Sequence, residues 1–195
     1  MPAPVAVGLV YHLVFVALLV TATFIDYDLT IIPDQVTVPG MIVGLGLGAL
    51  FPEIRPTPSA AATHWDGFIV GLWGFFVGGG LTQGVRLLGS LALRREAMGF
   101  GDVTLMAMIG SFLGWQAAVL AFFIAPFFGL SHALAKLILY LGKRLRGDKG
   151  SSADREIPFG PYLSMAALML LLTWRWFWPG WAQSRFDIIR MVFFS

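Results

Sequence analysis

The sequence lacks cysteine and carries little charge. None of its 195 residues is cysteine, which excludes disulfide frameworks, zinc ribbons, thiol nucleophiles and cysteine-bound iron–sulfur clusters. Charged residues make up 12% of the chain, about half of the roughly 25% typical of a soluble domain. Hydrophobic residues make up 57%. This composition excludes disorder and a nucleic-acid-binding domain, argues against an ordinary soluble enzyme, and predicts an integral membrane protein.

Histidine is also scarce, and its three copies stand far apart at His12, His64 and His132. None belongs to an HExxH or His-x-x-Glu pattern, in which two side chains at helical spacing bind zinc. A metalloprotease is therefore a poor interpretation. We expect neither a metal site nor a cofactor.

Long apolar runs predict about six transmembrane helices in a single domain, residues 1–195. A membrane-spanning helix needs about 20 apolar residues. The apolar runs are residues 5–25, 36–51, 67–85, 103–141 and 158–178. The fourth run is far too long for one crossing, so we expect two helices joined near Gly114. The predicted fold class is an all-α, polytopic membrane helical bundle.

Basic residues predict the orientation, because loops rich in lysine and arginine stay on the cytoplasmic side. Loop 142–156 holds five of the thirteen basic residues, Arg94 and Arg95 flank another loop, and loop 52–66 holds only Arg55. The predicted cytoplasmic loops are 26–37, 94–101 and 142–156. This arrangement places the N-terminus outside a bacterial-type inner membrane.

Glycines recur at intervals of four residues in two of the predicted helices. One series is Gly40, Gly44 and Gly48, and Gly74 and Gly78 repeat the spacing in the next helix. Small residues at this interval line one helix face and let a second helix approach closely. The pattern predicts close helix packing.

Acidic residues number eleven, and two of them stand at predicted cytoplasmic ends of helices. Asp26 ends the first helix, and Asp102 opens the fourth after Gly99-Phe-Gly101. Ionisable groups at membrane depth are costly and usually functional. Two carboxyl groups that converge in a low-dielectric site share one proton, and such a pair can activate water and polarise a scissile carbonyl.

The neighbouring residues fit this use. Gly99 and Gly101 are expected to allow positive φ and the close approach of another chain. Pro33 and Asp34 are expected to fix a turn just after the first helix.

A simpler interpretation stays open for each aspartate. Asp102 could be the N-cap of the fourth helix, because aspartate is a favoured N-cap residue. Asp26 and Asp28 could be solvated loop residues, since aspartate is common in turns.

Three sequence blocks resemble the type IV prepilin peptidases. They read FIDYDLTIIPD at 24–34, EAMGFGDVTLMAMIG at 96–110 and IPFGPYL at 157–163. Their order, their spacing and the predicted topology agree over nearly the whole chain. The chain thus resembles a short form of this family of GxGD-type intramembrane aspartyl proteases, one without the family's N-terminal cysteine-bearing region.

The resemblance implies an aspartic endopeptidase of the cytoplasmic membrane face. Its substrate would be a type IV prepilin or pseudopilin, whose basic leader is removed after a glycine. Asp26 and Asp102 match the two aspartates of the family and are the implied catalytic residues. Pro33 and Asp34 match its Pro-Asp pair, which we interpret as a positioning element. The implied partners are the prepilin and the lipid bilayer, with no nucleic acid.

Two further acidic residues, Asp28 and Glu96, are candidates for binding the basic leader or the new N-terminus. Solvated surface charge is the simpler interpretation of both. The chain departs from the family at Thr104, where many members carry lysine. It also lacks the paired Cys-x-x-Cys motifs that bifunctional members use in N-methylation. We therefore expect peptidase activity and do not predict methyltransferase activity.

Two other classes of protein remain as alternatives. A proton-coupled transporter also uses intramembrane acids, but it would place them at mid-span and show repeats between its halves. An inactive assembly scaffold would need neither aspartate. Asp26→Asn and Asp102→Asn distinguish these classes, because a protease loses cleavage with each change and a scaffold keeps its role.

Overall fold

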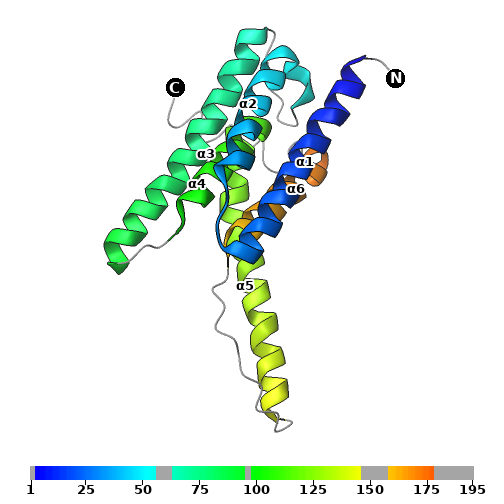
Figure 1. The fold of residues 1–195 in the computed structure, drawn as a ribbon. Helices are drawn as coiled ribbons and strands as arrows, with labels where there is room; N and C mark the ends of the chain where they lie inside the picture. The colour runs from blue at the N-terminus through cyan, green and yellow to red at the C-terminus, as the bar shows by residue number, and fades with distance from the viewer. Residues whose placement is uncertain (1–2, 56–62, 95–97, 146–157, 178–195) are drawn as a thin grey trace.

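The architecture is that of a computed structural model, which describes residues 3–55, 63–94, 98–145 and 158–177. All regular structure in these ranges is helical. The elements are α1 (Ala3–Leu29), α2 (Asp34–Leu50), the 3-10 helix η1 (Pro52–Ile54), α3 (His64–Leu93), α4 (Phe100–Leu113), α5 (Trp115–Leu145) and α6 (Gly160–Phe177) (Figure 1). The predicted all-α fold with six main helices is confirmed.

The first predicted loop, residues 26–37, is wrong in its bounds. Helix α1 continues to Leu29 and α2 begins at Asp34, so only residues 30–33 connect them. The apolar run ends before the helix does, because a helix needs backbone hydrogen bonds and not apolar side chains to continue. The N–H of Thr30 still bonds to the carbonyl of Asp26 at 2.9 Å. Asp26 therefore lies on a helix and not in a loop.

The long run 103–141 is divided as predicted. Helix α4 ends at Leu113 and α5 begins at Trp115. Gly114 between them has a φ of 88°, a conformation that glycine adopts without steric penalty. Its N–H still bonds to the carbonyl of Gly110 at 2.8 Å. The chain thus turns at a single glycine.

Helix α3 is longer than the predicted run 67–85. Its N-terminus has a capping box, in which Thr63 and Asp66 each bond to the backbone of the other. Its last residue is Leu93, and the C-cap Arg94 has a left-handed φ of 53°. Polar signals at both ends therefore set the helix bounds, whereas hydropathy alone detects only the central part.

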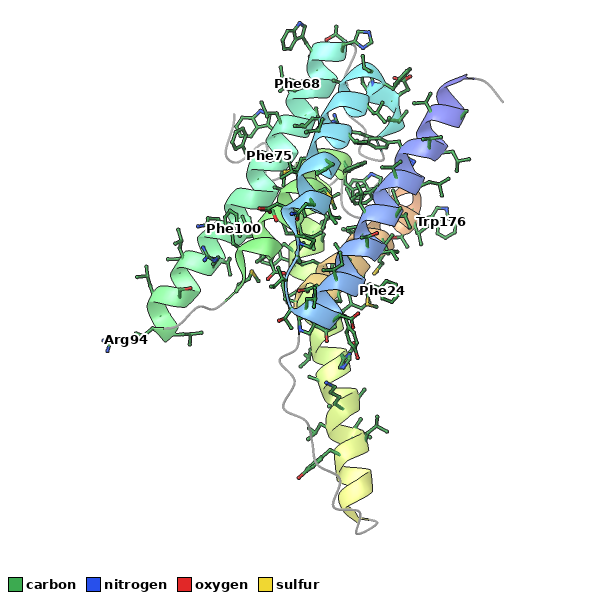
Figure 2. The ribbon with its side chains drawn as sticks, viewed as in Figure 1. Phe24, Phe68, Phe75, Arg94, Phe100 and Trp176 are labelled. Atoms are coloured by element: carbon green, nitrogen blue, oxygen red, sulfur yellow. The ribbon has the colours of Figure 1, made fainter. Side chains whose placement is uncertain are left out.

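Three of the helices are long and apolar enough to cross a membrane: Ala6–Leu29, His64–Leu93 and Trp115–Tyr140. Helices α2, α4 and α6 are apolar but shorter. Large apolar side chains cover the outside of the bundle. Phe24 and Trp176 point away from it (Figure 2), and Phe24, Phe100 and Trp176 are 67%, 55% and 82% exposed. An apolar outer surface around a helical bundle is typical of membrane proteins.

Helix α4 is the central helix of the bundle. It contacts α2, α3, α5 and α6, and its side chains from Val103 to Leu113 are nearly all buried. Phe15 of α1 stacks on Phe112 with ring centroids 4.7 Å apart. The Tyr11 hydroxyl donates a hydrogen bond of 2.9 Å to the carbonyl of Phe112. Contacts on every side therefore hold α4, and Asp102 lies in its first turn.

Glycines allow the backbones of α3 and α4 to touch. A Cβ on Gly74 would overlap the carbonyl group of Gly110, and a Cβ on Gly78 would overlap that of Met106. The predicted role of this stripe in close helix packing is confirmed.

The glycines of α2 surround a buried arginine as well as a neighbouring helix. A Cβ on Gly48 would overlap the guanidinium group of Arg55, which is only 6% exposed. This group donates hydrogen bonds to the carbonyls of Gly44 (3.2 Å), Ser111 (3.3 Å) and Gly67. Arg55 thus joins α2, α3 and α4 at the end of the bundle that holds η1.

Candidate functional site

Two buried carboxyl groups from different helices lie close together. Asp26, in the last turn of α1, is 6% exposed, and Asp102, in the first turn of α4, is 8% exposed. Their carboxyl groups are close enough to repel each other electrostatically. The structure thus brings together the two aspartates that were predicted from the sequence.

Asp26 is buried because it continues the core-facing side of α1. The preceding buried residues Tyr11, Phe15, Leu19 and Ala22 follow one another at intervals of three or four residues, the spacing of one helix face. Asp26 occupies the next position of this series. Its interpretation as a solvated loop residue is therefore wrong.

Asp102 is held by the start of its own helix. The N-cap of α4 is Gly99, and Asp102 is the third residue of the helix, so its interpretation as the N-cap is wrong. Its carboxyl group accepts a hydrogen bond from the N–H of Gly99, which is one half of a capping box. This bond orients the carboxyl group at the helix N-terminus, where the helix dipole favours negative charge.

The two glycines of the GxGD segment do not adopt positive φ. Gly99 has a φ of −68°, Gly101 lies within the helix, and among the described glycines only Gly114 has a positive φ. Gly101 is closely approached by Ile32, since an added Cβ would lie 2.8 Å from the Cβ of Ile32, while the expected approach of another chain stays a prediction. The approaching segment is therefore the chain's own 30–33 connection.

A third helix completes the site through Gly160, a residue to which the sequence analysis gave no role. The N–H of Gly160 donates a hydrogen bond to the carboxyl group of Asp26. A Cβ on Gly160 would overlap Oδ2 of Asp26 and would lie 2.8 Å from Cδ1 of Ile32. A glycine in the first turn of a helix, directly before Pro161, is the signal that could have revealed this close approach.

The predicted turn after α1 is confirmed. Pro33 is the N-cap of α2, and its carbonyl accepts a hydrogen bond of 3.0 Å from the N–H of Val36. Asp34 follows as the first residue of α2 and is exposed, as is Asp28 near the end of α1. The structure therefore does not bring Asp28 or Asp34 into the buried carboxyl pair.

Two other sequence features bear on the site. Thr104, at the position where the resembled family often has lysine, donates a hydrogen bond of 3.0 Å to the carbonyl of Gly101. Glu96 lies outside the described residues. Within the described ranges, no group of three or more histidine and acidic side chains could hold a metal ion.

The fold and the site together define a class of protein. It is a helical membrane protein with two buried aspartates near each other at one end of its bundle. Each carboxyl group accepts a hydrogen bond from the backbone of a glycine in the first turn or at the N-cap of a helix. Such a pair can hold one proton between two groups and exchange it with a bound water molecule.

Residues 13–134 match the sequence profile of the type IV leader peptidase family. The chain belongs to this family, and its recognition from three sequence blocks is confirmed. No solved structure matches the chain.

Several curated relatives are prepilin leader peptidase/N-methyltransferases. That of Aeromonas salmonicida strain A449 is 31% identical over 165 residues, which cover 85% of this chain and 50% of the relative. That of Myxococcus xanthus strain DK1622 is 34% identical over 88% of this chain and 45% of the relative. That of Pseudomonas putida is 31% identical over 79% and 46%. The chain spans about half the length of these relatives.

Proposed function

We propose that the chain is an aspartic endopeptidase that removes the leader peptide of type IV prepilins or pseudopilins. The observation that carries this proposal is the pair of buried carboxyl groups that α1 and α4 bring together. Membership of the type IV leader peptidase family supports it, as do relatives that are named prepilin leader peptidases.

In the proposed reaction one carboxyl group of the pair is ionised and the other carries a proton. The ionised group accepts a proton from water as the water oxygen attacks the scissile carbonyl carbon. The protonated group donates its proton to the carbonyl oxygen. The tetrahedral intermediate then collapses and the C–N bond breaks. The leaving nitrogen takes a proton from the pair, and one hydroxyl of the intermediate returns a proton to the pair as the new carboxyl group forms.

The two glycine N–H groups would hold the carboxyl groups in the geometry that this reaction needs. The N–H of Gly160 bonds to Asp26, and the N–H of Gly99 bonds to Asp102. Because both donors are glycines, no side chain of theirs fills the space around the carboxyl groups. Groups fixed before the substrate arrives need not reorganise during the reaction.

The substrate would meet the site at the cytoplasmic face, with the N-terminus of the enzyme outside. The prepilin's apolar helix would stay in the bilayer while its basic leader lies in the cytoplasm. The exposed Asp28, at the same end of α1 as Asp26, and Glu96 are the proposed acidic partners of the leader. Cleavage after a glycine would let an extended segment without side-chain bulk approach the carboxyl pair.

Cleavage of a prepilin by the purified protein in detergent, followed by mass spectrometry, tests the proposal. We expect the wild type to cut after the leader glycine, and Asp26→Asn and Asp102→Asn each to lower the rate by about a hundredfold or more. Glu53→Gln is the matched control, because Glu53 is an exposed acid on η1, at the other end of the bundle (Figure 1). A wild type that cuts no prepilin, or a fully active Asn variant, would contradict the proposal.

A further inference from the structure

Two buried oxygen atoms near the site have no hydrogen-bond partner among the described residues. One is Oδ2 of Asp26, and the other is Oγ of Ser164 on α6. Ser164 is 2% exposed. An unpaired polar atom in the interior is costly, and nearly all such atoms in folded proteins have a partner. These two atoms are among several such atoms in the described residues, and a hydrogen bond between their side chains would satisfy both.

The fold places these two side chains in the same contact between helices. A Cβ on Gly160 would overlap Oδ2 of Asp26, so Gly160 faces Asp26 across the contact between α1 and α6. Ser164 is four residues after Gly160, which puts it on nearly the same face of α6, about 6 Å farther along the helix. Ser164 therefore faces α1 one turn from the Asp26 carboxyl group.

The directions of the side chains bring them closer still. Helical side chains lean toward the N-terminus of their own helix. Helices α1 and α6 run in opposite directions, with the last turn of α1 beside the first turn of α6 (Figure 1). Because the Asp26 carboxyl group already lies beside Gly160, it is the Ser164 side chain that leans toward it, back along α6 toward the level of Gly160.

The hydroxyl of Ser164 differs from two other buried hydroxyls, those of Ser111 and Thr82, and resembles that of Thr37 on α2, which also has no partner among the described residues. Ser111 donates to the carbonyl of Met108 at 2.7 Å, and Thr82 donates to that of Gly78 at 2.9 Å. These hydrogen bonds stay within the residue's own helix. Ser164 makes no such bond, so its hydroxyl is free to donate to a group on another helix.

We propose that Ser164 is a positioning residue, whose hydroxyl donates a hydrogen bond to the carboxyl group of Asp26. The Ser164 hydroxyl reaches Oδ2 directly after rotation of its side chain, or bonds to it through one bridging water molecule. Asp26 is then held from two sides, by the Gly160 N–H and by Ser164. The catalytic consequence rests on the proposed function, whereas the hydrogen bond itself does not.

Infrared spectroscopy tests the hydrogen bond without any substrate. The difference between the spectra of the wild type and of Asp26→Asn identifies the carboxyl bands of Asp26. We expect Ser164→Ala to shift these bands, and Ser164→Thr, which keeps the hydroxyl, to leave them in place. Ser111→Ala is the matched control, because it removes a buried hydroxyl that bonds within α4. Identical Asp26 bands in the wild type and in folded Ser164→Ala protein would overturn the proposal.

A second readout measures the effect on cleavage. We expect Ser164→Ala to lower kcat about tenfold, the loss typical of one hydrogen bond to a charged group, with KM unchanged. Recovery of kcat in Ser164→Thr would exclude a merely structural role. Should the wild type cleave no prepilin, the proposed function fails, while the infrared bands still decide whether Ser164 binds Asp26. An unchanged kcat in Ser164→Ala would refute the catalytic consequence.

Discussion

Replacing Gly160 by alanine adds one methyl group beside the Asp26 carboxyl group. The new Cβ would overlap Oδ2 and would lie 3.1 Å from Cγ of Asp26 and 2.8 Å from Cδ1 of Ile32. Carbon atoms pack at about 3.5–4.0 Å, so the carboxyl group has to move by about 1 Å. A displacement of about 1 Å in an active site costs about a hundredfold in rate. We therefore expect kcat of Gly160→Ala to fall about a hundredfold.

The same change has a small effect on stability. Overpacking costs about 1–3 kcal/mol, and the higher helix propensity of alanine offsets up to about 1 kcal/mol of this. The assay is the initial rate of prepilin cleavage in detergent, beside a thermal unfolding curve for each variant. Gly46→Ala is the control, because no atom lies within 4 Å of its added Cβ. A folded Gly160→Ala protein that cleaves at the wild-type rate would refute the reasoning.

Three further predictions concern stability, each measured by thermal or denaturant unfolding in detergent. Thr63→Ala breaks the capping box with Asp66 and should cost about 1 kcal/mol; an unchanged midpoint would contradict the cap. Gly74→Ala drives a methyl group onto the carbonyl of Gly110 and should cost about 1–3 kcal/mol; full stability would show that α3 and α4 can separate freely. Arg55→Ala leaves a cavity among three helices and should cost about 3 kcal/mol; a neutral result would contradict its packing role.

The helices could be predicted from the sequence, but their ends could not. Apolar runs indicate which segments are buried in lipid or in the core. They therefore locate α1 and α3 correctly, but they are shorter than the helices. The last turn of α1 contains Asp26 and Asp28 and continues through backbone hydrogen bonds. The break at Gly114 could be predicted because a run of that length exceeds one membrane crossing.

The aspartates could also be predicted, because acids are rare in a chain of this composition. The backbone groups that bond to their carboxyl groups could not be predicted. Gly160 lies 134 positions from Asp26 in the chain, and only the packing of α6 on α1 brings them together. The burial of Arg55 could not be predicted either, since a loop arginine is normally solvated and this one is buried among helix carbonyls. Such long-range contacts leave little trace in local sequence patterns.

The central claim is that α1 and α4 bring Asp26 and Asp102 into one site, and thiol cross-linking tests it most directly. The chain has no cysteine of its own, so the double variant Asp26→Cys/Asp102→Cys contains a single thiol pair. We predict that a short bifunctional thiol reagent joins this pair in isolated membranes. The control, Asp28→Cys/Asp102→Cys, should stay unlinked, because Asp28 is exposed and about 200° around the helix from Asp26. Efficient linkage of the control pair with none between positions 26 and 102 would contradict the account.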